Sequence, residues 1–178
     1  MSEQFTVRID KADVERRLGD LKAKAPQVIA KALNSTAKDA RRRLADKARE
    51  TYTVKIGGFT NHVKFKQRAS AGNLDAILGV DGRPLTLNRF AMRQNYTHAK
   101  VLQAGSFKEL RNSAGALSFR RGGLILQRRT RERYPLKGLH GPSVPVMVGS
   151  KRVYGILEPH INSDLQKNMS QAIAKLIG

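Results

Sequence analysis

Histidine and acidic side chains are the groups in this chain that could hold a metal ion or transfer a proton. The four histidines are His62, His98, His140 and His160, and no two of them are three or four residues apart. No helix can therefore present a pair of histidine ligands on one face. His160 is followed one helical turn later by Asp164, a spacing that is more common on polar helix surfaces than in sites. These residues do not predict a metal centre.

Acidic residues are scarce in the middle of the chain, where a metal-dependent nuclease would need them. Between residues 51 and 152 the acids are Asp75, Asp81, Glu109 and Glu132. Such a nuclease needs clustered carboxylates to hold Mg²⁺ against phosphate, and no Glu-x-Lys pattern follows the first two acids. Cysteine is absent, and no nucleophile elbow, Walker A or zincin motif occurs. We therefore expect neither enzymatic activity nor a cofactor.

Positive charge is the outstanding property of the composition. The 178 residues include 34 Lys and Arg against 14 acids, a net charge of +20. Such an excess repels itself, which indicates a polyanionic partner or acidic neighbouring proteins. The candidate DNA-facing residues are Arg120, Arg121, Arg128, Arg129, Arg131 and Arg133.

The last of these arginines are predicted to follow a strand at Leu124–Thr130, which leaves an exposed basic loop at Ser106–Gly123. If the strand continues, Arg129, Arg131 and Arg133 project from one face, because alternate residues of a strand point the same way. Such a row suits contact with the phosphates of DNA without reading of bases. Few aromatic residues accompany it, which disfavours stacking on single strands. Ion pairing with an acidic neighbouring subunit explains the row equally well.

The elements that would position these residues form an α+β fold, with N-terminal helices, a central antiparallel sheet and a long C-terminal helix. Apolar periodicity predicts a strand at Phe5–Ile9, a helix after Asp10 and a second helix from Pro26 to about Tyr52. Pro159 should kink or restart the C-terminal helix. The sheet strands are expected at Val63–Ser70, Asn73–Val80, Leu85–Phe90 and Ala99–Gly105. The C-terminal residues expected in the core are Ile156, Leu157, Ile161, Leu165, Ile173 and Leu176.

The length suits one domain over residues 1–178, with residues 1–25 as an N-terminal arm or extension. The N-terminal sequence has no apolar core of a secretory signal. No apolar run approaches the roughly 20 residues that a membrane span needs. We therefore expect no membrane partner.

A segment with two prolines, LKGLHGPSVPVM at Leu136–Met147, separates the arginines from the C-terminal helix. Its prolines fix the backbone, and Val144 and Val146 look exposed, which indicates a rigid apolar contact with a neighbouring subunit. A helix N-terminus capped by Ser143 explains the same residues. The candidate interface residues are Gly141, Pro142, Ser143, Val144, Pro145 and Val146.

Three stretches, taken in order, resemble one known family. Ile29–Lys55 contains Ala-Leu-Asn-x-Thr-Ala and ends in Tyr-x-Val-Lys, Val63–Phe90 contains Gly-Arg-Pro-Leu, and Tyr134–Val148 contains Gly-Pro-Ser-Val-Pro. Their order and spacing resemble the minor tail protein Z family of tailed phages and prophages, the tail-completion proteins of lambda-like siphophages. The resemblance runs from about residue 29 to the C-terminus.

This resemblance implies a non-enzymatic structural virion protein at the head-proximal end of the phage tail. It implies a homo-oligomeric ring, such as a hexamer, around the DNA channel, which helps tail assembly and head–tail joining. The implied partners are tail and neck proteins, such as the tail terminator and the head–tail connector, and double-stranded DNA of any sequence. The protein would be located in the virion, and in the host cytoplasm during assembly. The alternatives are a free basic nucleic-acid-binding protein and a phage nuclease.

Overall fold

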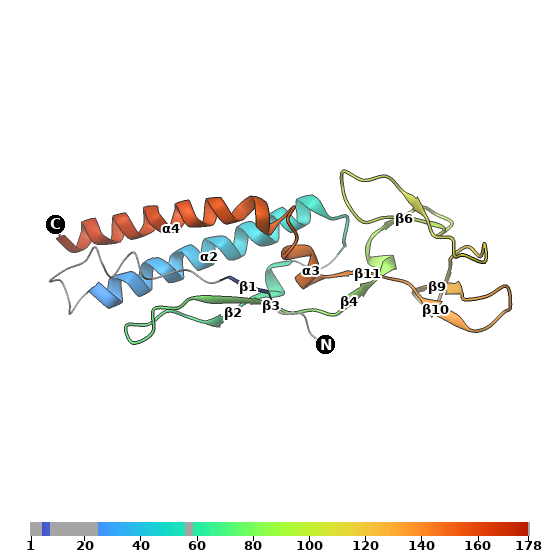
Figure 1. Cartoon of the computed structure of the whole chain (residues 1–178), viewed down its shortest axis with the longest axis horizontal. Coiled ribbons are helices and arrows are strands. Elements are labelled where there is room, and N and C mark those ends of the chain that lie inside the picture. The colour runs from blue at the N-terminus through green and yellow to red at the C-terminus, as the bar shows by residue number, and fades with distance from the viewer. Residues whose placement is uncertain (1–4, 8–24, 56–58, 178) are drawn as a thin grey trace.

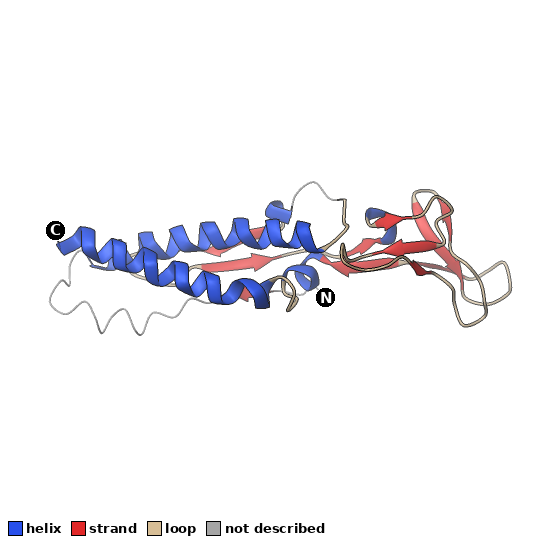
Figure 2. Cartoon of the chain, turned by 90° about the horizontal axis from the view of Figure 1, so that it is seen from above, coloured by secondary structure: helices blue, strands red, loops and turns tan. Residues whose placement is uncertain are grey.

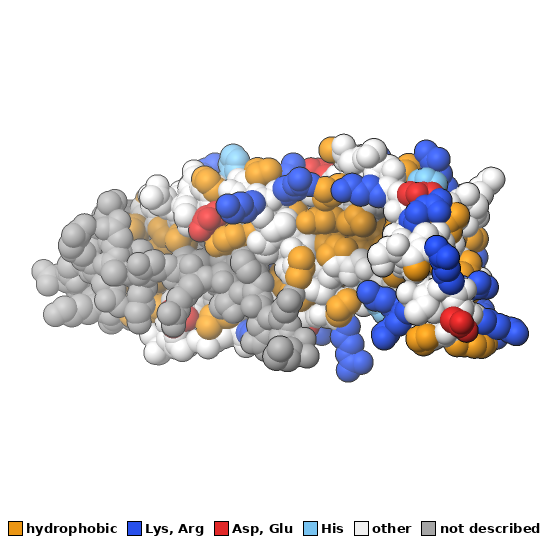
Figure 3. All heavy atoms as spheres, turned by 45° about the vertical axis from the view of Figure 1, so that its right-hand side comes forward, with side chains coloured by type: hydrophobic (Ala, Val, Ile, Leu, Met, Phe, Trp, Pro, Cys, Tyr) orange, Lys and Arg blue, Asp and Glu red, His pale blue; other side chains and the backbone are white. Residues whose placement is uncertain are grey.

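The computed structural model describes residues 5–7, 25–55 and 59–177 and confirms the α+β fold. The molecule is elongated: two long helices and one sheet form one end, and several small sheets form the other (Figures 1 and 2). We call the first end the body and residues 84–143, which form the second end, the arm. Figure 3 shows many Lys and Arg side chains on the surface of the arm.

Helix α2 (Ala25–Thr51) is the central element of the body, and it begins and ends close to the predicted bounds. Pro26 lies in its first turn, where its missing N–H would have no helical partner. The helix lies between α4 on one side and a sheet on the other (Figure 1), which explains its wide buried surface. The buried residues are Ala25, Ile29, Ala30, Ala32, Leu33, Thr36, Ala37, Ala40, Leu44, Ala45 and Ala48.

Helix α4 (Tyr154–Ile177) runs beside α2 (Figures 1 and 2). Ile161 is only 3% exposed, whereas Ile156 is 50% exposed, so the expectation that Ile156 lies in the core was wrong. Leu157, Leu165 and Ile173 are half-buried against the core. The side chain of Leu176 lies outside the described residues.

The helix is continuous from Tyr154 to Ile177, so of the two expected outcomes at Pro159, a kink or a restart, the restart does not occur. A proline in a helix removes one backbone hydrogen bond, here the bond to the carbonyl of Gly155. Packing along α2 supplies most of the stability of such a helix. We attribute the continuity of α4 to that packing.

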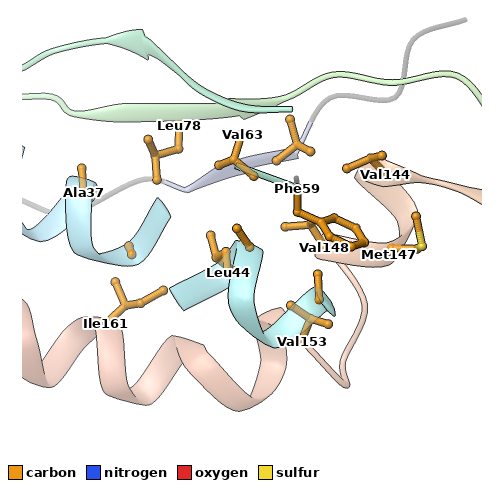
Figure 4. Close-up of a cluster of buried hydrophobic side chains, with 14 of the residues drawn as sticks. Ala37, Leu44, Phe59, Val63, Leu78, Val144, Met147, Val148, Val153 and Ile161 are labelled. Carbon is orange, nitrogen blue, oxygen red and sulfur yellow. The ribbon is translucent and has the colours of Figure 1, made fainter. Parts of the chain in front are cut away.

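The body sheet has the order β1-β3-β2 and is antiparallel throughout. Its strands are β1 (Phe5–Val7), β2 (Val63–Gln67) and β3 (Ile77–Val80), with the short helix η1 (Phe59–Asn61) before β2. The predicted alternation on β2 is confirmed, because Val63 is buried while Lys64 and Lys66 are exposed. Val63 and Leu78 point from the sheet toward α2 (Figure 4).

The arm consists of short antiparallel strands. Its elements are β4 (Pro84–Thr86), η2 (Leu87–Arg89), β5 (Ala91–Met92), β6 (His98–Lys100), β7 (Lys108–Glu109), β8 (Phe119–Arg121), β9 (Leu124–Arg128), β10 (Leu136–Gly138) and β11 (His140–Ser143). They form the sheets β5-β6-β7 and β10-β9-β8 and the pair β11-β4. The expected strand at Leu85–Phe90 is β4 followed by the helical turn η2. The expected loop at Ser106–Gly123 contains β7 and β8.

The arm is bonded to the end of α2 through its backbone. Tyr52 pairs with Leu102, and the N–H of Thr53 donates to the carbonyl of Val101 at 2.9 Å. The N–H of Gln103 donates to the carbonyl of Thr51, also at 2.9 Å. These bonds connect the last helical turn to the strand region after β6. The arm is therefore attached to the body along its side as well as through the chain at the outer ends of β4 and β11.

Two polar residues of the Ala-Leu-Asn-x-Thr-Ala stretch connect α2 to its neighbours. The Asn34 amide donates to the carbonyl of Ala69 at 2.8 Å and accepts from its N–H at 3.0 Å. The fully buried Thr36 hydroxyl accepts from Asn168 Nδ2 of α4 at 2.9 Å and donates to the carbonyl of Ala32 at 3.0 Å. These residues hold α2 against the β2–β3 connection and against α4.

The predicted helix after Asp10 lies outside the described residues, as do residues 8 and 9 of the first predicted strand. Among the helices that the structure describes, none is long and apolar enough to span a membrane.

Candidate nucleic-acid interface

The arm concentrates the positive charge of the protein. Residues 84–143 contain 12 Lys and Arg and only two acids, Glu109 and Glu132, a net charge of +10. Glu109 is occupied by Arg111, whose Nε and Nη2 donate to its two carboxylate oxygens at 3.0 Å each. This hydrogen bonding lowers the pKa of Glu109. The arm therefore presents a predominantly positive surface to a partner.

Arg120 and Arg121 lie on the β8–β9 hairpin, whose turn consists of two glycines. Gly122 and Gly123 have φ values of +56° and +79°, as a tight two-residue hairpin turn requires. Arg120 Nη1 donates to the Tyr96 hydroxyl at 2.8 Å, and its guanidinium lies 5.3 Å from the centre of that ring. Its neighbour Arg121 has no side-chain partner among the described residues. Arg120 is thus held within the arm, whereas Arg121 is available.

The remaining candidate arginines do not form a row on a strand, and this prediction was wrong. Strand β9 ends at Arg128, and residues 129–135 form an exposed loop that leads to β10. Cross-strand pairing of Leu136 with Arg128 and a 3.1 Å bond from the N–H of Arg129 to the carbonyl of Pro135 close this loop. The chain turns back before Arg131 and Arg133 could join a ladder. The β9–β10 loop lies at the far end of the arm (Figure 1).

A shallow hollow of about 280 Å³ lies beside this loop. Asn112 and Gln127 line it, and both amides donate to backbone carbonyls: Asn112 to Arg128 at 2.6 Å, and Gln127 to Leu110 at 2.9 Å. Lys137, which pairs with Gln127 across β9 and β10, also lines the hollow. We define the basic tip as Arg128, Arg129, Arg131, Arg133 and Lys137.

The basic tip is not neutralised by the protein itself. In the described part of the chain, none of its five cations takes part in an ion pair. Arg133 contacts the exposed ring of Tyr134, with its guanidinium 5.8 Å from the ring centre. Exposed cations without an ion-pair partner can contact a phosphate backbone or pair with acidic side chains of a partner.

The described residues place no cluster of possible metal ligands beside this basic surface. Residues 5–7, 25–55 and 59–177 contain no group of three or more His, Cys, Asp and Glu that could hold a metal ion. His160 is exposed, and the Asp164 carboxylate one turn later pairs instead with Arg43 of α2 at 3.0 Å.

The arrangement at the tip suits binding of an anionic partner. No family model, curated protein or solved structure matches the chain.

The proline-containing segment, the second candidate interface, points mostly into the protein. Ser143 caps the short helix α3 (Val144–Val148), and its hydroxyl accepts from the N–H of Val146 at 3.4 Å. Val144 is fully buried and Pro145 is buried, so the expectation that Val144 is exposed was wrong. Val144 and Val148 lie near Phe59 in the core (Figure 4). Only Val146 of the expected apolar contact is exposed, at 47%.

Gly141 and Pro142 lie on β11, which pairs with β4. At Gly141 a Cβ atom would lie closer than 3.0 Å to three ring atoms of the buried Phe90. The glycine is therefore needed for a close approach of the β11 backbone to an aromatic ring. This part of the segment packs against Phe90 at the root of the arm, and its contact with a neighbouring subunit stays a prediction.

Replacing Gly141 by alanine is expected to lower the free energy of unfolding by about 1–3 kcal/mol, because the Phe90 ring has to move within a packed core. Urea denaturation would measure the loss. Gly72→Ala is the control: a Cβ there has open space, so we expect little change or a slight gain. Equal stability of the two variants would contradict the close approach.

Sequence reasoning missed Lys137 and Tyr96 as parts of the basic surface. Lys137 lies within the proline-containing segment, and only the pairing of β10 with β9 brings it opposite Gln127. Tyr96 is far from Arg120 in sequence and has a positive φ of 56°. No local sequence pattern indicates either placement.

Proposed function

We propose that the protein is a non-enzymatic structural component of a phage virion that completes the tail at its head-proximal end. The observation that carries this proposal is the unpaired basic tip at the end of an arm that is firmly attached to a helical body. A subunit of a ring around DNA needs two separate surfaces, one for DNA and one for neighbouring proteins. The basic tip would contact the phosphates of DNA without reading its sequence, and the body would pack against neighbouring proteins.

The stretches that resemble the minor tail protein Z family support the proposal in a second way. Asn34 and Thr36 hold α2 against its neighbours, Gly141 allows β11 to approach Phe90, and Ser143 caps α3. These residues serve packing at the body and at the root of the arm. Residues that determine packing are the ones that proteins with the same fold are expected to have in common.

The test is the location of the protein in purified virions, by mass spectrometry of isolated tails and by electron microscopy. We expect the protein in tails, as a ring at the head-proximal end. We also expect Val146→Ser to fold like the parent but to enter tails less well, because Val146 is the exposed apolar residue of the proline-containing segment. Absence from purified virions would contradict the proposal.

The second candidate function is that of a free basic nucleic-acid-binding protein, which the unpaired tip also favours. Gel filtration with electron microscopy separates the two candidates. A closed ring supports the tail-completion role, and a monomer bound along DNA supports the second. Mg²⁺-dependent cleavage of DNA by the purified protein would contradict both and favour a nuclease.

A further inference from the structure

A largely apolar groove lies where the arm meets the body. Its volume is about 550 Å³, within the range of about 300–1,000 Å³ that is usual for binding sites. The end of α2, the arm and the turn between α3 and α4 all contribute to it. Its apolar floor consists of Tyr52, Leu87, Val101, Leu102 and Leu110. Figure 3 shows hydrophobic side chains gathered between the two ends of the molecule, with Lys and Arg side chains at their edge.

The rim of the groove is positively charged. Lys108 lines it on the arm side, and Lys151 and Arg152 line it on the α3–α4 turn. All three are exposed, and none forms an ion pair among the described residues. No lining residue is acidic. The groove thus combines an apolar floor with exposed cations at its edge that are not neutralised by acidic side chains of the described residues.

The backbone around the floor is already ordered. Tyr52 pairs with Leu102, and hydrogen bonds of 2.9 Å connect Thr53 to Val101 and Gln103 to Thr51. A floor held in this way needs little rearrangement on binding, which favours affinity. The elements that form the groove are therefore held together by backbone hydrogen bonds before any partner binds.

We propose that this groove docks an acidic amphipathic segment of a partner protein. Apolar side chains of the segment fill the floor, and its Asp and Glu side chains pair with Lys108, Lys151 and Arg152. Duplex DNA fits less well, because an apolar floor provides few hydrogen-bond donors and no cations for phosphate groups. The proposal depends neither on DNA binding nor on a ring.

A library of short random peptides, panned on the immobilised full-length protein, tests the proposal. We expect enrichment of peptides that combine Asp or Glu with Leu, Ile, Met or Phe. The most enriched peptide, synthesised with a fluorescent label, then serves as the probe in anisotropy titrations. The variant Lys108→Glu/Lys151→Glu/Arg152→Glu should bind it at least about tenfold more weakly, because each rim pair is lost and replaced by repulsion.

A matched control separates the rim from the overall charge. Lys38→Glu/Arg42→Glu/Lys64→Glu changes the net charge equally, at exposed cations of the body that form no ion pair in the part of the chain that the structure describes. We expect it to weaken peptide binding less than about threefold, since salt screens charges beyond roughly 8 Å. Leu102→Gln, which makes the floor polar, should weaken binding with the rim intact.

Three outcomes would overturn the proposal: enrichment of neutral or basic peptides, no enrichment at all, and equal losses in the rim variant and the control. Unlabelled duplex DNA provides a further check. It should leave the bound peptide in place, because the basic tip and the groove are different surfaces. Displacement of the peptide by DNA would mean that the groove is part of the nucleic-acid interface instead.

Discussion

Replacing Arg129, Arg131 and Arg133 by serine is expected to reduce the salt dependence of duplex DNA binding by about two to three units of slope. Each phosphate that a protein cation neutralises contributes about 0.9 to the slope of the logarithm of the binding constant against that of salt concentration. Three phosphates would account for a difference of this size. Titrations of a duplex between about 50 and 200 mM salt would measure it.

The expected binding itself is weak and indifferent to sequence. The three arginines lie within one short exposed loop, closed at its base by β9 and β10, so they can meet neighbouring phosphates of one duplex. They need not share the face of a strand to do so. Phosphate contacts of this kind position a protein without reading bases, which would suit the proposed place around a DNA channel.

The control for this prediction removes equal charge from the body. Lys38→Ser/Arg42→Ser/Lys64→Ser should change the slope by less than about one unit. An unaltered salt slope in the loop variant, or equal changes of slope in the loop variant and the body control, would contradict DNA binding by the basic tip. If the tip pairs with protein instead, the loop variant should bind DNA as before. It should then lose association with an acidic tail or neck partner.

Replacing Ile161 by alanine is expected to cost about 2–5 kcal/mol of unfolding free energy. Ile161 is 3% exposed and lies on α4 near Leu44 and Ala37 of α2 (Figure 4). The change removes apolar contacts and leaves a cavity that two long, well-packed helices cannot easily close. Thermal or urea unfolding would measure the loss.

Ile156→Ala is the matched control, since it makes the same change on the same helix at a residue that is 50% exposed. It should cost less than about 1 kcal/mol. If both variants melt alike, the stripe of α4 does not pack on α2 in the way that the structure describes. A larger effect of Ile156→Ala on assembly than on stability would point to a subunit contact at that residue.

Long periodic segments of the fold were predictable from the sequence, and short ones were not. Helix α2 shows apolar residues at three- and four-residue steps over many turns, and its observed bounds agree with the predicted ones. Strand β2 follows from its alternation, and β3 from the short turn-like connection that joins it to β2. The arm strands β5 and β7 have two residues each, too few to show any periodicity, and pairing with neighbours determines them.

The candidate sites depended on contacts that no local pattern contains. The end of β9 at Arg128 was missed because the arginines beyond it continue an alternating pattern while the chain has already turned. Val144 was expected to be exposed because it lies between prolines, but it packs in the core with residues distant in sequence. The groove escaped prediction because three separate segments contribute to its lining.

The hydrogen bond between Asn168 and Thr36 limits how the two long helices can be aligned. Small residues such as alanine allow helices to slide past one another with little loss of apolar contact. A shift of one turn would separate the Asn168 amide from the Thr36 hydroxyl. Because Thr36 is fully buried, solvent could not replace the lost donor. Alternative alignments are thereby disfavoured by a polar pair instead of by shape. The position of α4 along α2 is consequently set by one hydrogen bond between a buried hydroxyl and an amide.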